Sequence, residues 1–266
     1  MASSVEQSPE DPSSHASLQS AQSTRPQPAA LAWTRRDTAL VAALWVVVAA
    51  ALAALSIAAH SHSEFPGDEG LTVLIQKIQF PPLVHFINFS SDANWPAPAG
   101  YTALAIILAL LVARQISAAI ATVIASFGAD LANVTINSLV ARPRPHNVHI
   151  HVVANLGLHS YPSGHVTHVV TFYGFLLYLT IHFERNHPRW TPLLWVVRVI
   201  CLYFIIFIGP SRVLEGEHWP SDVLGSYLVA SLMLVIAIAL FHLLLREFAR
   251  LHDWLAMRRE ARANTA

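Results

Sequence analysis

Long apolar runs alternate with short polar segments along most of the chain. Backbone groups inside a bilayer must find their partners within their own segment, which favours helices over strands. Each run is about long enough for a ~30 Å hydrocarbon core, with the second the shortest. The pattern therefore predicts an all-α polytopic membrane protein, a bundle of six transmembrane helices. The six runs are residues 39–59, 99–113, 116–141, 166–183, 193–210 and 223–245.

The two ends of the chain differ from this middle part. Residues 1–36 are rich in Ser, Pro, Gln and Ala without an apolar period, which predicts a disordered tail. The first run is longer than the ~7–15-residue core of a cleavable signal peptide, so we interpret it as a retained span. We expect a membrane domain over residues 37–247. Residues 248–266 are expected to form a basic helical tail, which fixes the topology or lies near anionic headgroups.

The distribution of arginines predicts the orientation of the spans. With six spans, both termini and two of the loops share one side, and that side carries most of the arginines. The positive-inside rule then places both termini in the cytoplasm and loops 60–97, 142–165 and 211–222 outside. In the first outer loop, Leu71–Phe89 is split by two prolines. This predicts two short amphipathic helices at the interface or, as an alternative, a packed loop element.

The composition supports the membrane assignment and excludes some functions. The chain is 54% hydrophobic and 12% charged, whereas a soluble domain carries about 25% charged residues. Acidic and basic residues balance at 16 each, so no excess charge points to nucleic acid as a partner. The single cysteine, Cys201, excludes an internal disulfide and a cysteine metal cluster.

The last two outer loops concentrate reactive residue types on one predicted face. Arg144 and Arg212 can each bind a phosphoryl group bidentately. Ser163 and Gly164 directly precede the fourth span, where the first amides of a helix favour an anion, and His165 follows them. The two loops together therefore predict a phosphate-binding site.

A histidine pair adds possible catalytic groups to this site. Asp222 follows His218 by four residues at a predicted helix start, so its carboxylate can reach back to one imidazole nitrogen. That contact would fix the tautomer and leave the other nitrogen free to attack. Two histidines in different surroundings, His218 and His165, allow one to attack phosphorus and the other to protonate the leaving oxygen. This scheme requires no metal and no cofactor.

These residues resemble the three-part signature of the type 2 phosphatidic acid phosphatase superfamily. Its pattern is Lys-x6-Arg-Pro, Pro-Ser-Gly-His and Ser-Arg-x5-His-x3-Asp. The second part matches in full at Pro162–His165 and the third from Ser211 to Asp222, while the first matches at Arg144-Pro145. The resemblance covers roughly residues 65–245. The superfamily includes lipid phosphate phosphatases, bacterial acid phosphatases and vanadium haloperoxidases.

The resemblance implies a role for each matched residue. His218 becomes the nucleophile, Asp222 its partner, and His165 the general acid and later the base for water. The expected phosphate-binding residues are Arg144, Arg212, Ser163, Gly164 and, at the position of the family lysine, Asn137.

Asn137 is where the chain departs from the family pattern. Asparagine can donate a hydrogen bond but brings no charge, and the only lysine, Lys77, lies in another loop. Arg142 either compensates for the missing charge or binds lipid headgroups. Asp130, Asn133 and Asn137 share one helix face. For Asp130, inside the span, we favour a structural role over a functional one.

Other polar and aromatic residues carry weaker signals. The loop histidines could suggest a metal site, but no carboxylate or cysteine pattern accompanies them, so we interpret them as solvated. Tryptophans near predicted span ends fit interfacial anchoring. The histidines are His146, His149, His151 and His159, and the tryptophans are Trp95, Trp190, Trp195 and Trp219.

Together the residues predict a metal-independent lipid phosphatase acting through a phosphohistidine. Candidate substrates are undecaprenyl pyrophosphate, phosphatidic acid, diacylglycerol pyrophosphate and phosphatidylglycerophosphate. We expect a bacterial inner membrane with the site facing the periplasm. A lipid phosphotransferase on the same scaffold and a non-catalytic membrane protein with a degraded site stay open as alternatives. A haloperoxidase is disfavoured, because the known haloperoxidases of the superfamily are soluble, whereas this chain has six predicted spans.

Overall fold

The computed structural model describes residues 35–146, 148–154, 157 and 159–263. Chain contacts divide the protein into two units, Met1–Val41 and Ala42–Ala266. Of the first unit only the beginning of one helix is described, so the tail predicted over residues 1–36 lies almost wholly outside the described residues. Everything below concerns the second unit.

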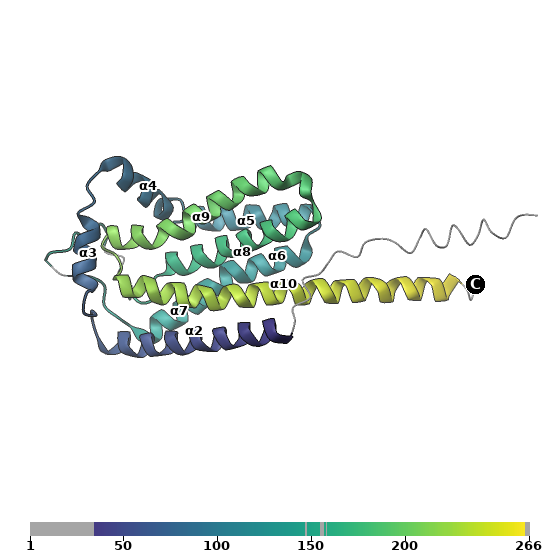
Figure 1. Cartoon of the computed structure of the whole chain (residues 1–266), viewed down its shortest axis with the longest axis horizontal. Coiled ribbons are helices and arrows are strands. Elements are labelled where there is room, and N and C mark those ends of the chain that lie inside the picture. Colours follow the sequence, from purple (N-terminus) through teal and green to yellow (C-terminus); the bar gives the residue numbers. More distant parts are fainter. Residues whose placement is uncertain (1–34, 147, 155–156, 158, 264–266) are drawn as a thin grey trace, which may run out of the picture. The chain divides into compact units, whose positions relative to one another are not determined.

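The described residues form helices and connecting loops, without β-strands (Figure 1). The predicted all-α class is confirmed. In chain order the elements are α2 (Arg35–Ser61), α3 (Asp68–Gln76), α4 (Pro81–Asp92), α5 (Pro96–Val112), α6 (Ile116–Val123), the π-helix η1 (Ile124–Gly128), α7 (Ala129–Val140), α8 (Gly164–Asn186), the 3₁₀-helix η2 (Pro188–Trp190), α9 (Thr191–Leu214) and α10 (Pro220–Ala263).

Five segments of the described chain are each long and apolar enough to cross a membrane. A sixth arises only if α4 and α5 count as one span, because they are bent by 64° where they meet. With 17 residues, α5 rises about 25 Å and falls short of a ~30 Å core. The run predicted as the shortest span is thus the one that needs a second helix, α4, to reach the length of a membrane span.

The protein core forms around α8, which runs between α9 and α10 (Figure 1). In its most apolar window 72% of the residues are buried inside the protein, against 28% for the span that contains α9. Buried aromatic and aliphatic side chains such as Phe172, Phe175 and Ile208 fill this core. Since α8 is held on several sides, its first turn is a rigid place for a reactive residue.

The loop helices α3 and α4 pack against the bundle. Contacts join both helices to α9, and α3 also contacts α10. Phe86 of α4 lies edge-on against Tyr203 and Phe207 of α9, and the Tyr203 hydroxyl donates to the Phe86 carbonyl at 2.5 Å. The first outer loop thus contains the two predicted short helices, and they pack against the bundle, as the second alternative proposed.

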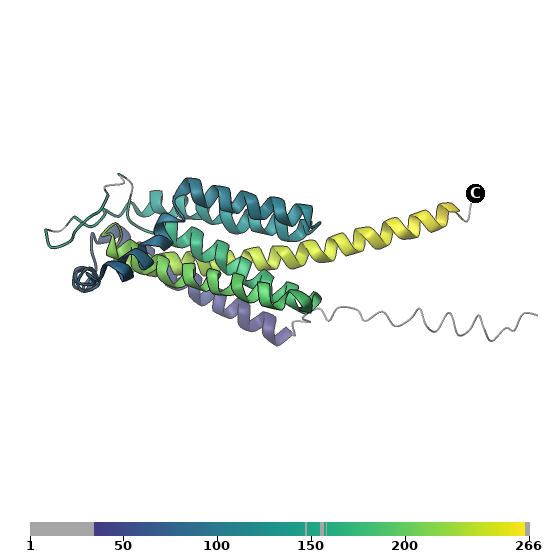
Figure 2. The same cartoon turned by 90° about the horizontal axis from the view of Figure 1, so that it is seen from above.

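The chain reverses twice at the end of the bundle where α3 and α4 lie. There α7 and α9 end, and α8 and α10 begin (Figures 1 and 2). The reversal after α9 depends on Gly216, which has a φ of +68° and sits against a backbone carbonyl, where a Cβ would lie 2.2 Å from the oxygen of His151. Both loops that carry the sequence motifs therefore meet at one end of the bundle.

Candidate active site

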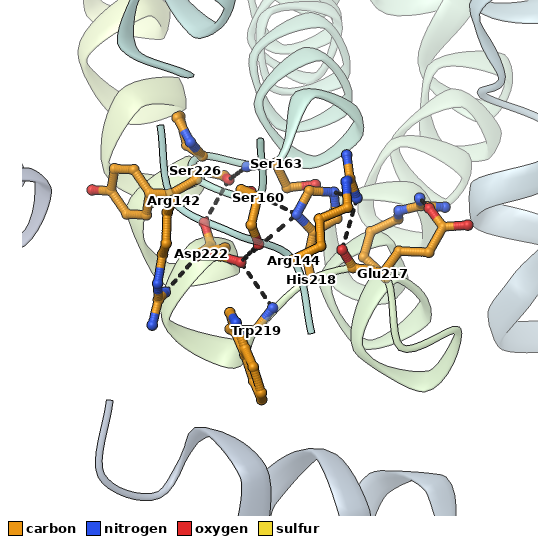
Figure 3. Close-up of polar contacts among 12 residues, drawn as sticks. Arg142, Arg144, Ser160, Ser163, Glu217, His218, Trp219, Asp222 and Ser226 are labelled. Carbon is orange, nitrogen blue, oxygen red and sulfur yellow. Dashed lines mark hydrogen bonds and ion pairs between the residues drawn. The ribbon is translucent and has the colours of Figure 1, made fainter. Parts of the chain in front are cut away.

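The two loops bring the motif residues into one cluster (Figure 3). Ser163 is the N-cap residue of α8, and His165 lies in its first turn. Arg212 lies in the last turn of α9, and Asp222 lies in the first turn of α10. Arg144 comes from the loop between α7 and α8, and His218 comes from the turn between α9 and α10. Residues far apart in the sequence thus converge as the motif spacing predicted.

His218 is held in one orientation by the backbone. Its ring is 2% exposed, and Nδ1 lies 2.7 Å from the carbonyl oxygen of Ser160. A carbonyl can only accept, so Nδ1 must carry the hydrogen and Nε2 must carry the lone pair. Nη1 of Arg144 lies 3.3 Å from Nε2. The nitrogen with the free electron pair therefore faces a cation that can also bind a phosphoryl oxygen.

The surroundings of His218 keep its imidazole neutral. Its pKa is lowered from 6.5 to about 4, mainly by burial and also by the charges of Arg144 and Arg212, against the opposing effect of Asp222. At neutral pH the imidazole is therefore uncharged, with a lone pair on one nitrogen, which is the state a nucleophile needs.

Asp222 stands close to His218 without a direct hydrogen bond to it. The distance from Nδ1 to Oδ2 is 3.8 Å, longer than the contact that the four-residue spacing suggested. Instead Oδ2 accepts from the Trp219 amide at 2.9 Å and from the Ser160 hydroxyl. Ser160 thus links the two motif residues, because its carbonyl accepts from His218 and its hydroxyl donates to Asp222.

Arg142 belongs to the support of Asp222. Its guanidinium is fully buried, with Nη1 donating to Asp222 Oδ1 at 2.6 Å and to Ser221 Oγ at 2.7 Å. Nη2 pairs with Asp68 at 2.9 Å. Neither sequence-based role for Arg142 is right, because a side chain occupied in this way neither reaches a headgroup nor replaces a missing phosphate ligand. Arg142 and Arg144 lie two positions apart, and nothing in the sequence separates their roles.

Arg212 is paired with two acidic residues that the sequence analysis did not single out. Nη1 donates to Glu215 Oε2 at 2.5 Å and to Ser91 Oγ at 2.5 Å, and Nη2 pairs with Glu217. Glu215 and Glu217 are 7% and 1% exposed. Carboxylates so placed occupy the donors that a phosphoryl group would use. The sequence did offer a signal for these partners, because both glutamates lie within the five-residue spacer between Arg212 and His218.

Several buried polar atoms of the site have no hydrogen-bond partner among the described residues. They include Ser163 Oγ, His165 Nε2 and Arg212 Nε. A buried polar atom without a partner costs about 1–3 kcal/mol, so such a group is expected where a ligand completes it. These three come from motif residues, which is the arrangement an anion site needs.

Trp95 is a site residue with a role that the sequence analysis did not foresee. Its ring lies edge-on against His165, with centroids 5.3 Å apart and planes at 86°. It is the N-cap residue of α5, at the bend after α4. Interfacial anchoring alone does not describe it, because it covers one side of a motif histidine. No motif marks this position, since the contact depends on the 64° bend.

Two of the loop histidines make local contacts. His146 Nδ1 contacts the Arg144 carbonyl at 2.9 Å, and the exposed His149 pairs with Glu69 at 2.8 Å. In the described part of the chain no three His, Cys, Asp or Glu side chains come together as metal ligands would.

Comparison with known proteins identifies the class to which this fold and site belong. The model of the PAP2 superfamily matches residues 115–246, a segment that contains all three motifs. Residues 115–246 therefore belong to the PAP2 superfamily, and the chain is an integral membrane protein.

One solved structure shares the fold. It is described as the first transmembrane PAP2-type phosphatidylglycerolphosphate phosphatase from Bacillus subtilis. The TM-score is 0.62 at 18% identity, covering 73% of this chain and 94% of the other. A search of curated proteins found no match.

Proposed function

We propose that this protein is a lipid phosphatase that works through a phosphohistidine at His218. The observation that carries the proposal is the tautomer of His218, whose Nδ1 donates to a carbonyl while Nε2 faces Arg144. A neutral imidazole with its lone pair directed at an anion-binding group is set for attack on phosphorus. The PAP2 membership and the fold of a membrane phosphatase support this reading.

The reaction runs in two displacement steps. The lone pair on Nε2 attacks phosphorus, the bond from phosphorus to the leaving oxygen breaks, and His165 gives that oxygen a proton. Arg144 and Arg212 hold the non-bridging oxygens, where charge is spread in the transition state. Water then attacks the phosphohistidine and His165 takes its proton, which releases phosphate and restores the His218 lone pair.

The surroundings of Nδ1 support the intermediate. Once Nε2 carries a phosphoryl group, the imidazole becomes cationic and its Nδ1–H becomes a stronger donor. The Ser160 carbonyl at 2.7 Å accepts this hydrogen, and the Asp222 carboxylate at 3.8 Å adds a negative charge. Both groups therefore stabilise the state in which His218 is phosphorylated.

The substrate we propose is a phosphomonoester or diphosphate on a membrane lipid. The site lies where four helices of the bundle begin or end, which suits a phosphate at headgroup level. Undecaprenyl pyrophosphate, phosphatidic acid, diacylglycerol pyrophosphate and phosphatidylglycerophosphate have this chemistry. We further propose a bacterial inner membrane, cytoplasmic termini and a periplasmic site, on the arginine distribution.

Phosphate release from a panel of these lipids tests the proposal. Purified wild-type protein should release phosphate with a chelator present. His218→Ala should lose activity by at least ~10³-fold, and His252→Ala, an exposed histidine on the distal part of α10, should keep it. Complete dependence on a divalent metal, or release unchanged in His218→Ala, would overturn the mechanism.

A phosphotransferase is the second candidate, because the same phosphohistidine can react with a lipid hydroxyl in place of water. A second lipid carrying a free hydroxyl is added to the assay, and its phosphorylated product is measured beside free phosphate. Free phosphate as the main product supports the hydrolase, and a phosphorylated acceptor supports the transferase.

A further inference from the structure

One face of α7 is bonded to the segment that carries the second motif. Asp130, Asn133 and Asn137 lie at positions i, i+3 and i+7, so they share a helix face. Each has a partner in the segment 159–168, which includes Ser163 and His165. The motif segment is therefore attached to α7 along its length.

Asn137 holds the part of this segment that orients His218. Its Nδ2 donates to the carbonyls of His159 at 3.0 Å and Tyr161 at 3.1 Å. These two carbonyls flank Ser160, whose own carbonyl accepts from His218. Fixing the backbone on both sides of Ser160 fixes the acceptor that selects the His218 tautomer.

The geometry leaves Asn137 without a donor for phosphate. A carboxamide nitrogen has two hydrogens, and here both point at backbone carbonyls, which can only accept. The remaining atom, Oδ1, is an acceptor and would repel an anion. Asn137, at the position of the family lysine, therefore bonds to the loop backbone. The resemblance to the family motif had predicted a phosphate ligand at this position.

Asn133 continues the attachment past the motif serine. It is 6% exposed, and its Nδ2 donates to the Pro162 carbonyl and to Thr167 Oγ1, both at 3.2 Å. Its Oδ1 lies 3.3 Å from where a Cβ on Gly164 would be. Asn133 thus bonds to the chain on either side of Ser163 and His165.

We propose that Asn133 and Asn137 are positioning residues that clamp residues 159–167 against α7. The clamp sets the Ser160 carbonyl for the nucleophile and sets Ser163 and His165 for the phosphoryl group. This inference rests on the proposed function for its kinetic consequences, and on the hydrogen bonds alone for its structural ones.

The kinetic test compares Asn133→Ala, Asn137→Ala and the double variant. Thr135→Ala is the matched control, because Thr135 is exposed on the same helix and its hydroxyl donates to the Leu131 carbonyl within it. Each single substitution should lower kcat ~10–100-fold, and the double variant should lose little more, since residues that act as a unit are not additive. If Asn137→Ala does not express, Asn137→Asp, of equal size and without donors, replaces it.

Inhibition by inorganic phosphate separates the clamp from a ligand role for Asn137. The clamp predicts that Ki for phosphate changes less than kcat in Asn137→Ala. A ligand predicts that Ki rises as much as kcat falls, and that the two alanine substitutions are additive. Either outcome overturns the clamp.

Hydrogen exchange tests the clamp independently of activity. Amides in a peptide covering residues 159–169 should exchange at least ~10-fold faster in Asn137→Ala than in wild type or Thr135→Ala. If wild type releases no phosphate from any lipid, the proposed function fails while this measurement still decides on the clamp. Equal exchange in the three proteins would show that the clamp does not exist.

Discussion

Nδ1 of His218 lies 2.7 Å from the carbonyl oxygen of Ser160. This contact determines which nitrogen of the imidazole can react, because the acceptor is a backbone group that cannot change its role. The hydroxyl of the same serine donates to Asp222. The proposed nucleophile and its acidic partner are therefore connected through a residue that belongs to neither the second nor the third motif.

Ser160→Ala should test that connection. The substitution keeps the carbonyl that accepts from His218 and removes the hydroxyl that donates to Asp222. We expect kcat to fall about 10-fold, because loss of a hydrogen bond to a charged group is worth roughly 1.5–3 kcal/mol and only part of it reaches the transition state. Phosphate release is measured beside Ser138→Ala, an exposed serine on α7 that should behave as wild type.

The comparison with Asp222→Asn decides how the carboxylate acts. If Ser160 transmits its effect, the two substitutions combined lose little more than Asp222→Asn alone. If Asp222 moves to bond His218 directly during the reaction, Ser160→Ala is close to wild type while Asp222→Asn loses most of the activity.

The pKa of His218 gives a second prediction, which concerns pH. With a value of about 4, the ring stays neutral down to well below its ordinary value of 6.5. Titration followed by ¹⁵N shifts of histidine-labelled protein should show one ring that protonates near pH 4 and is missing in His218→Gln. Because the charge of Arg144 lowers this pKa, Arg144→Gln should move the titration upward. A ring titrating near 6.5 in wild type contradicts the buried, neutral nucleophile.

The same shift predicts a third result, on stability. The folded-state pKa lies below the unfolded one, so between pH 4 and 6.5 the unfolded state binds more protons. The contribution is complete above pH 6.5 and is lost as the pH falls toward 4, by roughly 3 kcal/mol at most. Melting in detergent should therefore show a smaller loss between pH 7 and pH 5 for His218→Gln than for wild type. An equal loss in both proteins would count against the shift.

The helices and the clustering of the motif residues could be predicted from the sequence for a physical reason. Long apolar runs form helices in a bilayer, and the motif residues lie at short, fixed distances from the helix ends. Ser163 and His165 lie at the start of α8, and Asp222 lies in the first turn of α10. The positions of these residues relative to the helix ends were therefore enough to predict that they lie at the same end of the bundle.

The partners of those residues could not be predicted, because they depend on contacts between distant segments. Arg142 and Arg144 are two positions apart and differ completely in role, since one turns toward Asp68 on α3 and the other toward His218. Trp95 reaches His165 through the bend between α4 and α5. Neither result follows from a local pattern.

Glu217→Gln provides a fourth prediction, on phosphate affinity. Glu217 pairs with Nη2 of Arg212 in a fully buried position, so a phosphoryl group has to compete with this carboxylate. Replacing it with a neutral amide should tighten inhibition by inorganic phosphate or vanadate about 5–10-fold, since a charge-assisted pair is replaced by a weaker contact. Phosphate should also raise the melting temperature more than it does in wild type. Weaker inhibition in the variant would mean that Glu217 orients Arg212 and does not compete with the ligand.

Arg142→Met should destabilise the protein more than it changes any step of catalysis. The guanidinium is shared by two buried carboxylates, Asp68 and Asp222, and removing one partner of a buried ion pair typically costs about 3–5 kcal/mol. Adding Asp68→Asn removes one of the two unpaired charges and should recover part of the melting temperature, while Asp222 stays unpaired. Since Asp222 assists His218, kcat of the double variant should stay below wild type even where the fold is recovered. Full recovery of kcat together with stability would show that Arg142 serves the fold alone.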